Sequence, residues 1–204
     1  MRQNIISTRK HRGEIMKLTL ATNEEINLLH SKYKRFNTRL LENPSELYNH
    51  TGIMDVFNRV LTEEEAFELL GEKHNLKYGA NFSDTFTQLF HIEENGVYVH
   101  IYKKGLSKKA FKYKLSCLNR PEANIFRKLF SHSKGIYKIG DVEALVFLTK
   151  LSVTELYFVD FFFPSLDTMI IGNYDLSFPI YSNSIIGFNK CKEIIEENGL
   201  FIRQ

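Results

Sequence analysis

The chain contains few cysteines and no tryptophan, and it lacks any long apolar run. Its 204 residues include only two cysteines, Cys117 and Cys191, which are too few for a disulfide framework and fit a reducing compartment. No stretch reaches the ~18 consecutive apolar residues of a membrane-spanning helix. The first twenty residues carry charge throughout and hold no apolar run of the length found in secretion signals. We therefore expect a cytoplasmic protein that makes no membrane contact.

The usual signatures of catalysis and metal binding are also absent. The sequence contains no P-loop, no G-x-G-x-x-G and no G-x-S-x-G. The seven histidines form no H-x-x-x-H or H-E-x-x-H pair, and neither cysteine belongs to a zinc-ligand pattern. His91 and Glu93 form an H-x-E triplet, but the P-C-x-x-C half of a zinc-deaminase signature is missing. We expect no metal, no cofactor and no catalytic residue.

Aromatic residues are plentiful, with 17 Phe and 10 Tyr in a chain that is 43% hydrophobic. This composition indicates a folded protein with an aromatic-rich core. Residues 1–20 are expected to form a basic, flexible lead-in. Residues 21–204 are expected to form a single domain.

Helix-start signals occur at several points. Thr22 with Glu25, and Thr62 with Glu65, each form a capping box, and Asn119 precedes Pro121 as a further cap. These signals predict helices over about 23–41, over 62–71 and after 119. A last helix is predicted over about 188–197, ending at Asn198-Gly199.

Strand signals follow a two-residue alternation. Residues 86–92 and 97–101 alternate on either side of Asn95-Gly96, which predicts a β-hairpin with a type I′ turn. Residues 111–117 predict a third strand, and 155–161, 168–171 and 176–181 predict three more. Residues 44–61 are ambiguous, and 142–148 fit a strand or a short buried helix equally well. Together these elements predict an α+β fold, with an antiparallel sheet of about six strands and helices at both ends of the chain.

Charge is unevenly distributed along the chain. The net charge is only +3, yet residues 103–138 contain eleven Lys or Arg and a single acid, Glu122. Such a block attracts phosphates or acidic protein surfaces, unless it faces solvent or is neutralised internally. On the predicted strand its aromatic residues, Phe111 and Tyr113, point away from the lysines, which argues against a surface that stacks nucleic-acid bases. The candidate partner-binding lysines are Lys103, Lys104, Lys108, Lys109, Lys112 and Lys114.

Three carboxylates fall at predicted strand ends and turns near the C-terminus: Asp160, Asp167 and Asp175. If they gather in space, they can hold Mg²⁺ for phosphodiester chemistry. Aspartate at a turn more often caps the backbone. A metal-dependent nuclease is therefore kept only as an alternative.

The segment from Thr154 to Ser182 resembles the C-terminal part of small bacterial immunity proteins, which neutralise toxins. In both, a strand with an Asp near its end is followed by a short turn, an apolar strand, a polar turn and a last strand. Asp160, Asp167, Met169–Ile171 and Tyr174–Ser177 carry this likeness. The chain departs from this family in two ways: many immunity proteins have Trp where this chain has Met169, and those that block nucleases are often acidic, whereas this chain is mildly basic. The resemblance implies a stoichiometric inhibitor of one cognate toxin in the cytosol, without a catalytic residue.

The sequence therefore favours a non-catalytic binding protein of the immunity class, with one cognate protein as its partner. Two kinds of partner fit: an acidic one that meets the basic stretch, or a basic one that meets acids around Glu63–Glu68 or Asp160–Asp175. The candidate partner-binding residues are the six lysines together with Asp160, Asp167, Tyr174 and Asp175. The alternatives are a nucleic-acid-binding protein and a metal-dependent nuclease, both using the 103–114 stretch.

Overall fold

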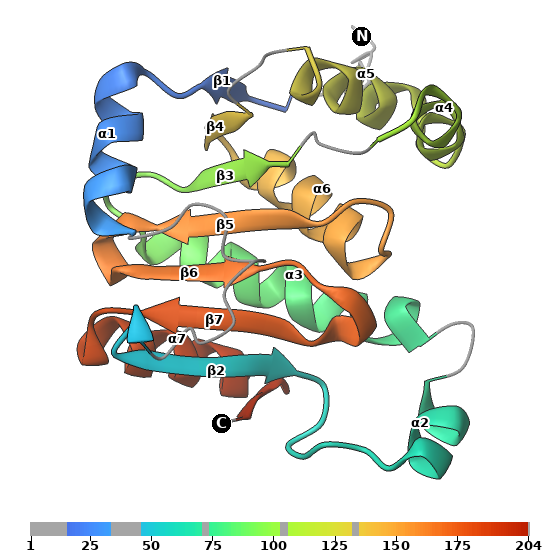
Figure 1. Cartoon of the computed structure of the whole chain (residues 1–204), viewed down its shortest axis with the longest axis vertical. Coiled ribbons are helices and arrows are strands. Elements are labelled where there is room, and N and C mark those ends of the chain that lie inside the picture. The colour runs from blue at the N-terminus through green and yellow to red at the C-terminus, as the bar shows by residue number, and fades with distance from the viewer. Residues whose placement is uncertain (1–15, 34–45, 71–73, 103–105, 132–134, 204) are drawn as a thin grey trace, which may run out of the picture.

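A computed structural model describes residues 16–33, 46–70, 74–102, 106–131 and 135–203. Within these ranges the chain forms one eight-stranded sheet in which every neighbouring pair is antiparallel (Figure 1). The strand order is β1-β4-β3-β5-β6-β7-β2-β8. The strands are β1 (Leu18–Leu20), β2 (His50–Asp55), β3 (Tyr98–Ile101), β4 (Ile136–Ile139), β5 (Val159–Phe163), β6 (Thr168–Ile171), β7 (Phe178–Ser182) and β8 (Phe201–Arg203).

Helices are distributed along the whole described chain rather than only near its ends. They are α1 (Asn23–Lys32), α2 (Glu63–Leu69), α3 (His74–Ile92), α4 (Lys108–Ser116), α5 (Arg120–Leu129), α6 (Val142–Val153) and α7 (Ile185–Glu197). Two short 3₁₀ turns, η3 (Pro164–Leu166) and η4 (Tyr174–Leu176), connect the C-terminal strands. The α+β class is therefore confirmed, with eight described strands in place of about six.

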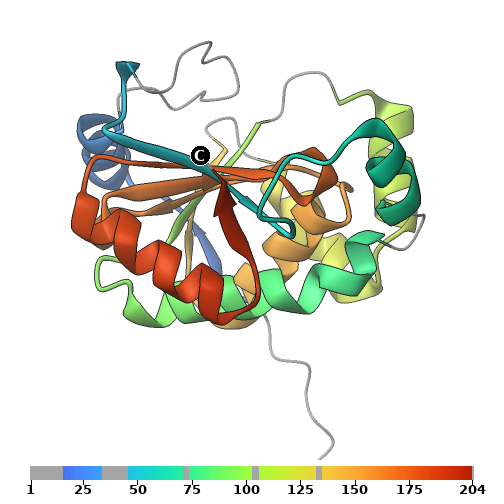
Figure 2. The same cartoon turned by 90° about the horizontal axis from the view of Figure 1, so that it is seen from below.

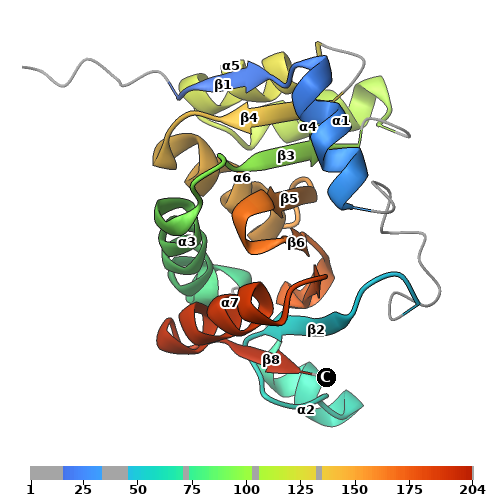
Figure 3. The same ribbon diagram turned by 90° about the vertical axis from the view of Figure 1, so that its left-hand side faces the viewer.

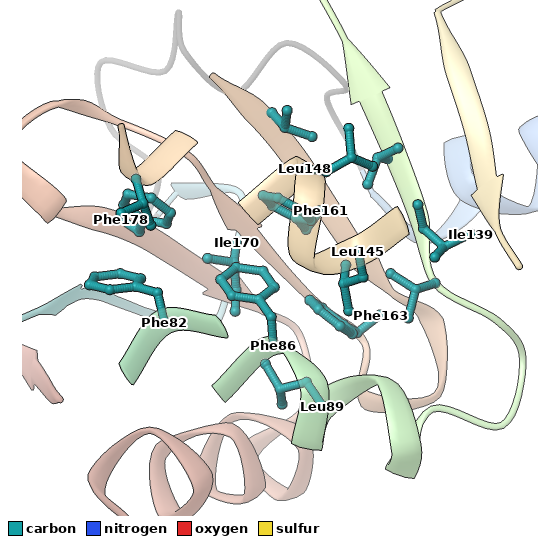
Figure 4. Packing of buried hydrophobic residues seen from close by; sticks show 14 of the residues in the cluster. Phe82, Phe86, Leu89, Ile139, Leu145, Leu148, Phe161, Phe163, Ile170 and Phe178 are labelled. Carbon is teal, nitrogen blue, oxygen red and sulfur yellow. The ribbon is translucent and has the colours of Figure 1, made fainter. Parts of the chain in front are cut away.

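Three helices, α3, α6 and α7, cover one face of the sheet (Figures 2 and 3). Between them and the strands lies the main core (Figure 4). The Phe86 ring from α3 lies 4.5 Å from the ring of Phe161 on β5, and the Phe82 ring lies 4.8 Å from that of Phe178 on β7. All four side chains are fully buried.

The opposite face carries a smaller core beneath α1 (Figure 3). Tyr33, which caps the end of α1, packs 5.1 Å from the Phe162 ring, and Tyr48 stacks 5.3 Å from Tyr181. The capping box at Thr22 is present, and Glu25 also accepts hydrogen bonds from Tyr98 and Lys138. These contacts fasten α1 across the sheet.

The predicted hairpin at 86–101 is wrong in its first arm. Residues 74–92 form the helix α3, because Phe82, Phe86 and Leu89 recur at helical spacing and bury together against the sheet. The second arm is confirmed as β3. Gly96 does adopt a positive φ of 86°, but Asn95 does not, so this turn joins a helix to a strand and is not a type I′ hairpin.

The predicted strand at 111–117 is also wrong, since these residues belong to α4 and its C-cap. Residues 142–148 lie in α6, which settles that ambiguity in favour of a helix, while β2 occupies part of 44–61. The strands near 168–171 and 176–181, the capped starts of α2 and α5, and the final helix are confirmed. Of the expected lead-in, residues 18–20 form β1 in the sheet instead; residues 1–15, like residues 34–41 of the first predicted helix, lie outside the described residues.

None of the described helices is both long enough and apolar enough to cross a lipid bilayer.

Candidate functional site

Two of the predicted acidic residues near the C-terminus, Asp160 and Asp167, lie at opposite ends of the β5–β6 hairpin. Asp160 is buried in β5, at the end of the β5–β6 hairpin where it pairs with Ile171. Asp167 lies at the opposite end, in the connecting turn, 3.8 Å from the Lys32 ammonium. Within the described ranges, no group of three or more His, Cys, Asp or Glu side chains could hold a metal ion. The structure thus does not assemble the carboxylate cluster that a metal-dependent nuclease would need.

The candidate residues near the C-terminus have different neighbours in the structure. The Asp160 carboxylate lies 3.7 Å from Nδ1 of His100, a neighbour that sequence patterns did not indicate because the two residues are sixty positions apart. Asp167 and Asp175 adopt positive φ values of 52° and 53°, as aspartate does in tight turns. Tyr174 is 61% exposed and packs edge-on against Phe158.

Glu93 of the H-x-E triplet stabilises the turn that follows α3. The Glu93 carboxylate accepts hydrogen bonds from the backbone N–H of Ser165 and Asn95 and from the Ser165 hydroxyl. These bonds tie the end of α3 to the β5–β6 turn and satisfy the carboxylate within the protein.

The candidate lysines lie on a helix rather than along a strand. Lys108, Lys109 and Lys112 are exposed on α4, and Lys103 and Lys104 lie outside the described residues. Lys114 points inward and donates a hydrogen bond to the Leu156 carbonyl. Burial lowers the pKa of this Lys114 ammonium from its ordinary value. Lys114 is therefore a packing residue, while its three neighbours remain available at the surface.

The most unusual surface belongs to a segment that we name the acidic arm, residues 60–69. It consists of α2 and the turn before it, and it projects from the sheet at the lower right of Figure 1. None of the seven residues of α2 is buried. Phe67 is 90% exposed and Val60 is 74% exposed. Together with Leu69, which is 48% exposed, the arm exposes three large apolar side chains within ten residues, a concentration that is typical of an interaction site.

The arm also carries four glutamates. Glu63, Glu64 and Glu68 are exposed, whereas Glu65 forms a two-pronged ion pair with Arg59, with both N–O distances at 2.5 Å. That ion pair, assisted by the Thr62 backbone N–H, lowers the Glu65 pKa to about 2. Glu65 therefore stiffens the start of the arm, and the other three carboxylates give it negative charge. The sequence revealed these acids and the capping box, but not the exposure of Phe67, which depends on what packs around it.

A small aromatic cluster fixes the base of the arm. The His74 ring at the start of α3 stacks on Phe57, with ring centroids 5.9 Å apart and planes 5° apart, and meets Tyr78 edge-on at 5.2 Å. The cluster thereby holds the chain both before and after the arm. Leu76, 67% exposed, adds a further apolar side chain near this base.

A cavity of about 600 Å³ lies where β2 passes α7. Its described lining includes Tyr181, Phe188, Lys192 and Arg203 but no carboxylate and no thiol. His50, the one imidazole in this lining, packs its ring 5.8 Å from that of Phe188. The proton-transferring side chains of this lining are His50, Tyr181 and Lys192, and the lining pairs none of them with a carboxylate.

Comparison with known proteins gave no match to any family model, to any curated protein or to any solved structure.

Proposed function

We propose that the protein is a non-catalytic binding protein whose acidic arm docks onto a basic surface of one partner protein. Its function would be that of the immunity class, the stoichiometric occlusion of a cytosolic toxin. The observation that carries the proposal is the exposure of Phe67 on a helix that also exposes Glu63, Glu64 and Glu68. The likeness of the Thr154–Ser182 segment to immunity proteins adds support from the sequence.

The physical basis is the hydrophobic effect combined with charge complementarity. Burying an exposed phenylalanine side chain yields roughly 2–3 kcal/mol, which is the scale of an interface hot spot. The carboxylates of Glu63, Glu64 and Glu68 would attract a basic partner and orient it before contact. A standard interface of ~800 Å² per partner could form around the arm without disturbing the sheet.

The earlier candidate residues contribute unequally to this proposal. Asp160 is 1% exposed, so a partner could reach it only if the sheet opened. Asp167, Tyr174 and Asp175 lie in turns, where a partner large enough to extend beyond the arm could contact them. The exposed lysines of α4 have the wrong charge for a basic partner and are not part of this interface.

Affinity capture from the source cell lysate tests the proposal with matched variants. Phe67→Ser removes the central apolar contact, and Ile186→Ser removes a residue that is also exposed, at 80%, but lies on α7. We expect wild type and Ile186→Ser to capture the same protein in near-equal molar amount. Phe67→Ser is expected to weaken its binding by about 30-fold or more, the scale of a hot-spot truncation.

The captured protein is then produced alone and together with wild type or Phe67→Ser. The immunity function predicts that it arrests growth alone and that wild type, but not Phe67→Ser, restores growth. Capture that is equally strong with Phe67→Ser would overturn the arm as the binding site. A captured partner that is harmless alone would overturn the toxin-neutralising function.

A further inference from the structure

The helix pair α4–α5 forms a second charged surface, at the opposite end of the sheet from the acidic arm (Figure 1). A cluster of aromatic rings fixes how α4 is rotated. The Phe111 ring lies 5.6 Å from that of Phe126 and 5.4 Å from that of Phe130, both on or next to α5. Lys114 lies on the same inward side, 5.8 Å above the ring of Tyr157. These contacts determine which face of α4 points toward the rest of the protein.

The outward face of α4 combines cations with an aromatic ring. Lys109 and Lys112 are exposed there and Tyr113 is 68% exposed, while Lys108 is exposed at the first turn of the helix. Lys109 and Tyr113 are four residues apart, which places their side chains side by side on one helix face. On the predicted strand Tyr113 and the lysines would point to opposite faces, which argued against a surface that stacks bases. On the helix Tyr113 and Lys109 share one face, so that objection no longer applies.

This surface carries positive charge that the described protein does not neutralise. No acidic residue occurs between Glu94 and Glu122, and the Glu122 carboxylate is occupied by the Lys150 ammonium at 2.8 Å. No ion pair links Lys108, Lys109 or Lys112 to another described residue. Arg120 and Arg127 are exposed on α5 and add positive charge to the helix pair.

From this geometry we infer a binding site for single-stranded nucleic acid on the outward face of α4, with Tyr113 as its stacking platform. The backbone phosphates lie against Lys108, Lys109 and Lys112, while one base stacks on the Tyr113 ring. Proteins that bind single strands without sequence preference use this combination, because every base offers a flat aromatic face. An acidic protein partner fits less well, since the exposed part of α4 offers no aliphatic side chain beside Tyr113.

Fluorescence anisotropy with a labelled oligothymidine of about 20 nucleotides tests the site. If the three lysines neutralise three phosphates, the slope of log K against log salt is about −2, and affinity falls about 20-fold between about 50 and 200 mM salt. Replacing Lys109 and Lys112 by Gln is expected to make that slope shallower by about 1.4. Lys190→Gln, on the distant helix α7, controls for the loss of a surface charge.

Two substitutions at one position isolate stacking. Tyr113→Phe keeps an aromatic ring and is expected to bind like wild type. Tyr113→Leu keeps an apolar side chain without a ring and is expected to bind roughly 5- to 100-fold more weakly, with the salt slope unchanged. Both side chains stay outside the core, so thermal unfolding should match wild type and exclude misfolding as the cause.

Three results would overturn the site: no binding at low salt, equal affinities of Tyr113→Leu and wild type, or equally tight binding of polyglutamate. Equal affinities of Tyr113→Leu and wild type would show that no base stacks on Tyr113, and tight binding of polyglutamate would assign the surface to an acidic protein. Phe67→Ser should bind the oligothymidine normally, so the outcome here is independent of the proposed function of the acidic arm.

Discussion

The acidic arm is predicted to loosen as the solution becomes acidic, because a buried imidazole holds its base. His74 is 8% exposed, and its Nε2 atom is buried without a described hydrogen-bond partner. Burial lowers the pKa of His74 from its ordinary value of 6.5. Lys77 acts in the same direction, and the carboxylates of Asp55 and Asp175 oppose it. The folded arm therefore favours the neutral imidazole.

The sign of the effect follows from proton linkage. A histidine in the opened arm binds a proton near pH 6.5, whereas the docked histidine does so only at lower pH. The free energy of opening is therefore at its full value above about pH 6.5. It falls with decreasing pH by up to about 1.4 kcal/mol per pH unit, until the pKa of the docked form is reached. One pH unit in this window can thus populate the opened arm up to about tenfold more.

Hydrogen exchange of peptides covering residues 57–70 measures this opening, after correction for the intrinsic pH dependence of exchange. His74→Phe is the matched variant, because phenylalanine can stack on Phe57 but cannot be protonated. We expect the opening free energy of wild type to fall between about pH 7 and pH 5.5, and that of His74→Phe to stay level. Equal pH dependence in the two proteins would refute the reasoning, since both retain all the other titratable groups.

Three further predictions address stability and reactivity. Phe67→Ser should change the free energy of unfolding by less than about 0.5 kcal/mol, whereas Phe86→Ala, which empties a fully buried site, should cost about 3–5 kcal/mol by urea denaturation. A thiol reagent should modify the exposed Cys117 in the native protein but reach Cys191 only after unfolding, because burial raises the Cys191 pKa to about 12; rapid native reaction of two thiols would contradict this. Hydrogen bonding to the Thr22 backbone, aided by Lys138 and Tyr98, lowers the Glu25 pKa to about 2, so its stabilising effect is complete above pH 4.5 and lost as pH falls towards 2. Glu25→Gln should therefore lose less stability over that acidic range than wild type, as measured by thermal melts.

Local signals predicted the parts of the fold that depend on a few neighbouring residues. The capping boxes at Thr22 and Thr62 and the cap at Asn119 each require only residues within one helical turn, and all three are present. The strands β6 and β7 were also predicted, because turn residues bound each of them closely. In these places the short-range preference and the tertiary packing agree.

The segments predicted wrongly are those in which one sequence fits two periodicities. Residues 86–92 alternate between the two faces that a strand would have, but Phe86, Leu89 and Phe90 also stand three and four positions apart, as on one face of a helix. Over the nineteen residues of α3 the helical period prevails, because it alone buries Phe82 and Phe86 against the same sheet face. The partner surface that decides between the two periods lies far away in sequence, on β5 and β7, and no local window contains it.

The same distinction governs the candidate sites. Charge blocks are visible in a sequence, so both the acids of the arm and the lysines of α4 were found. Whether neighbouring residues share a face depends on the period of the element, and for Tyr113 and Lys109 a strand and a helix give opposite answers. The inference about nucleic acid therefore rests on the helical state of α4, which the packing of Phe111 against Phe126 and Phe130 maintains. Phe126→Ala disrupts this aromatic packing and should impair oligothymidine binding, although Phe126 itself is not at the surface. Phe82→Ala removes an equally buried ring beneath β7, and the protein that still folds should bind the oligothymidine as wild type does.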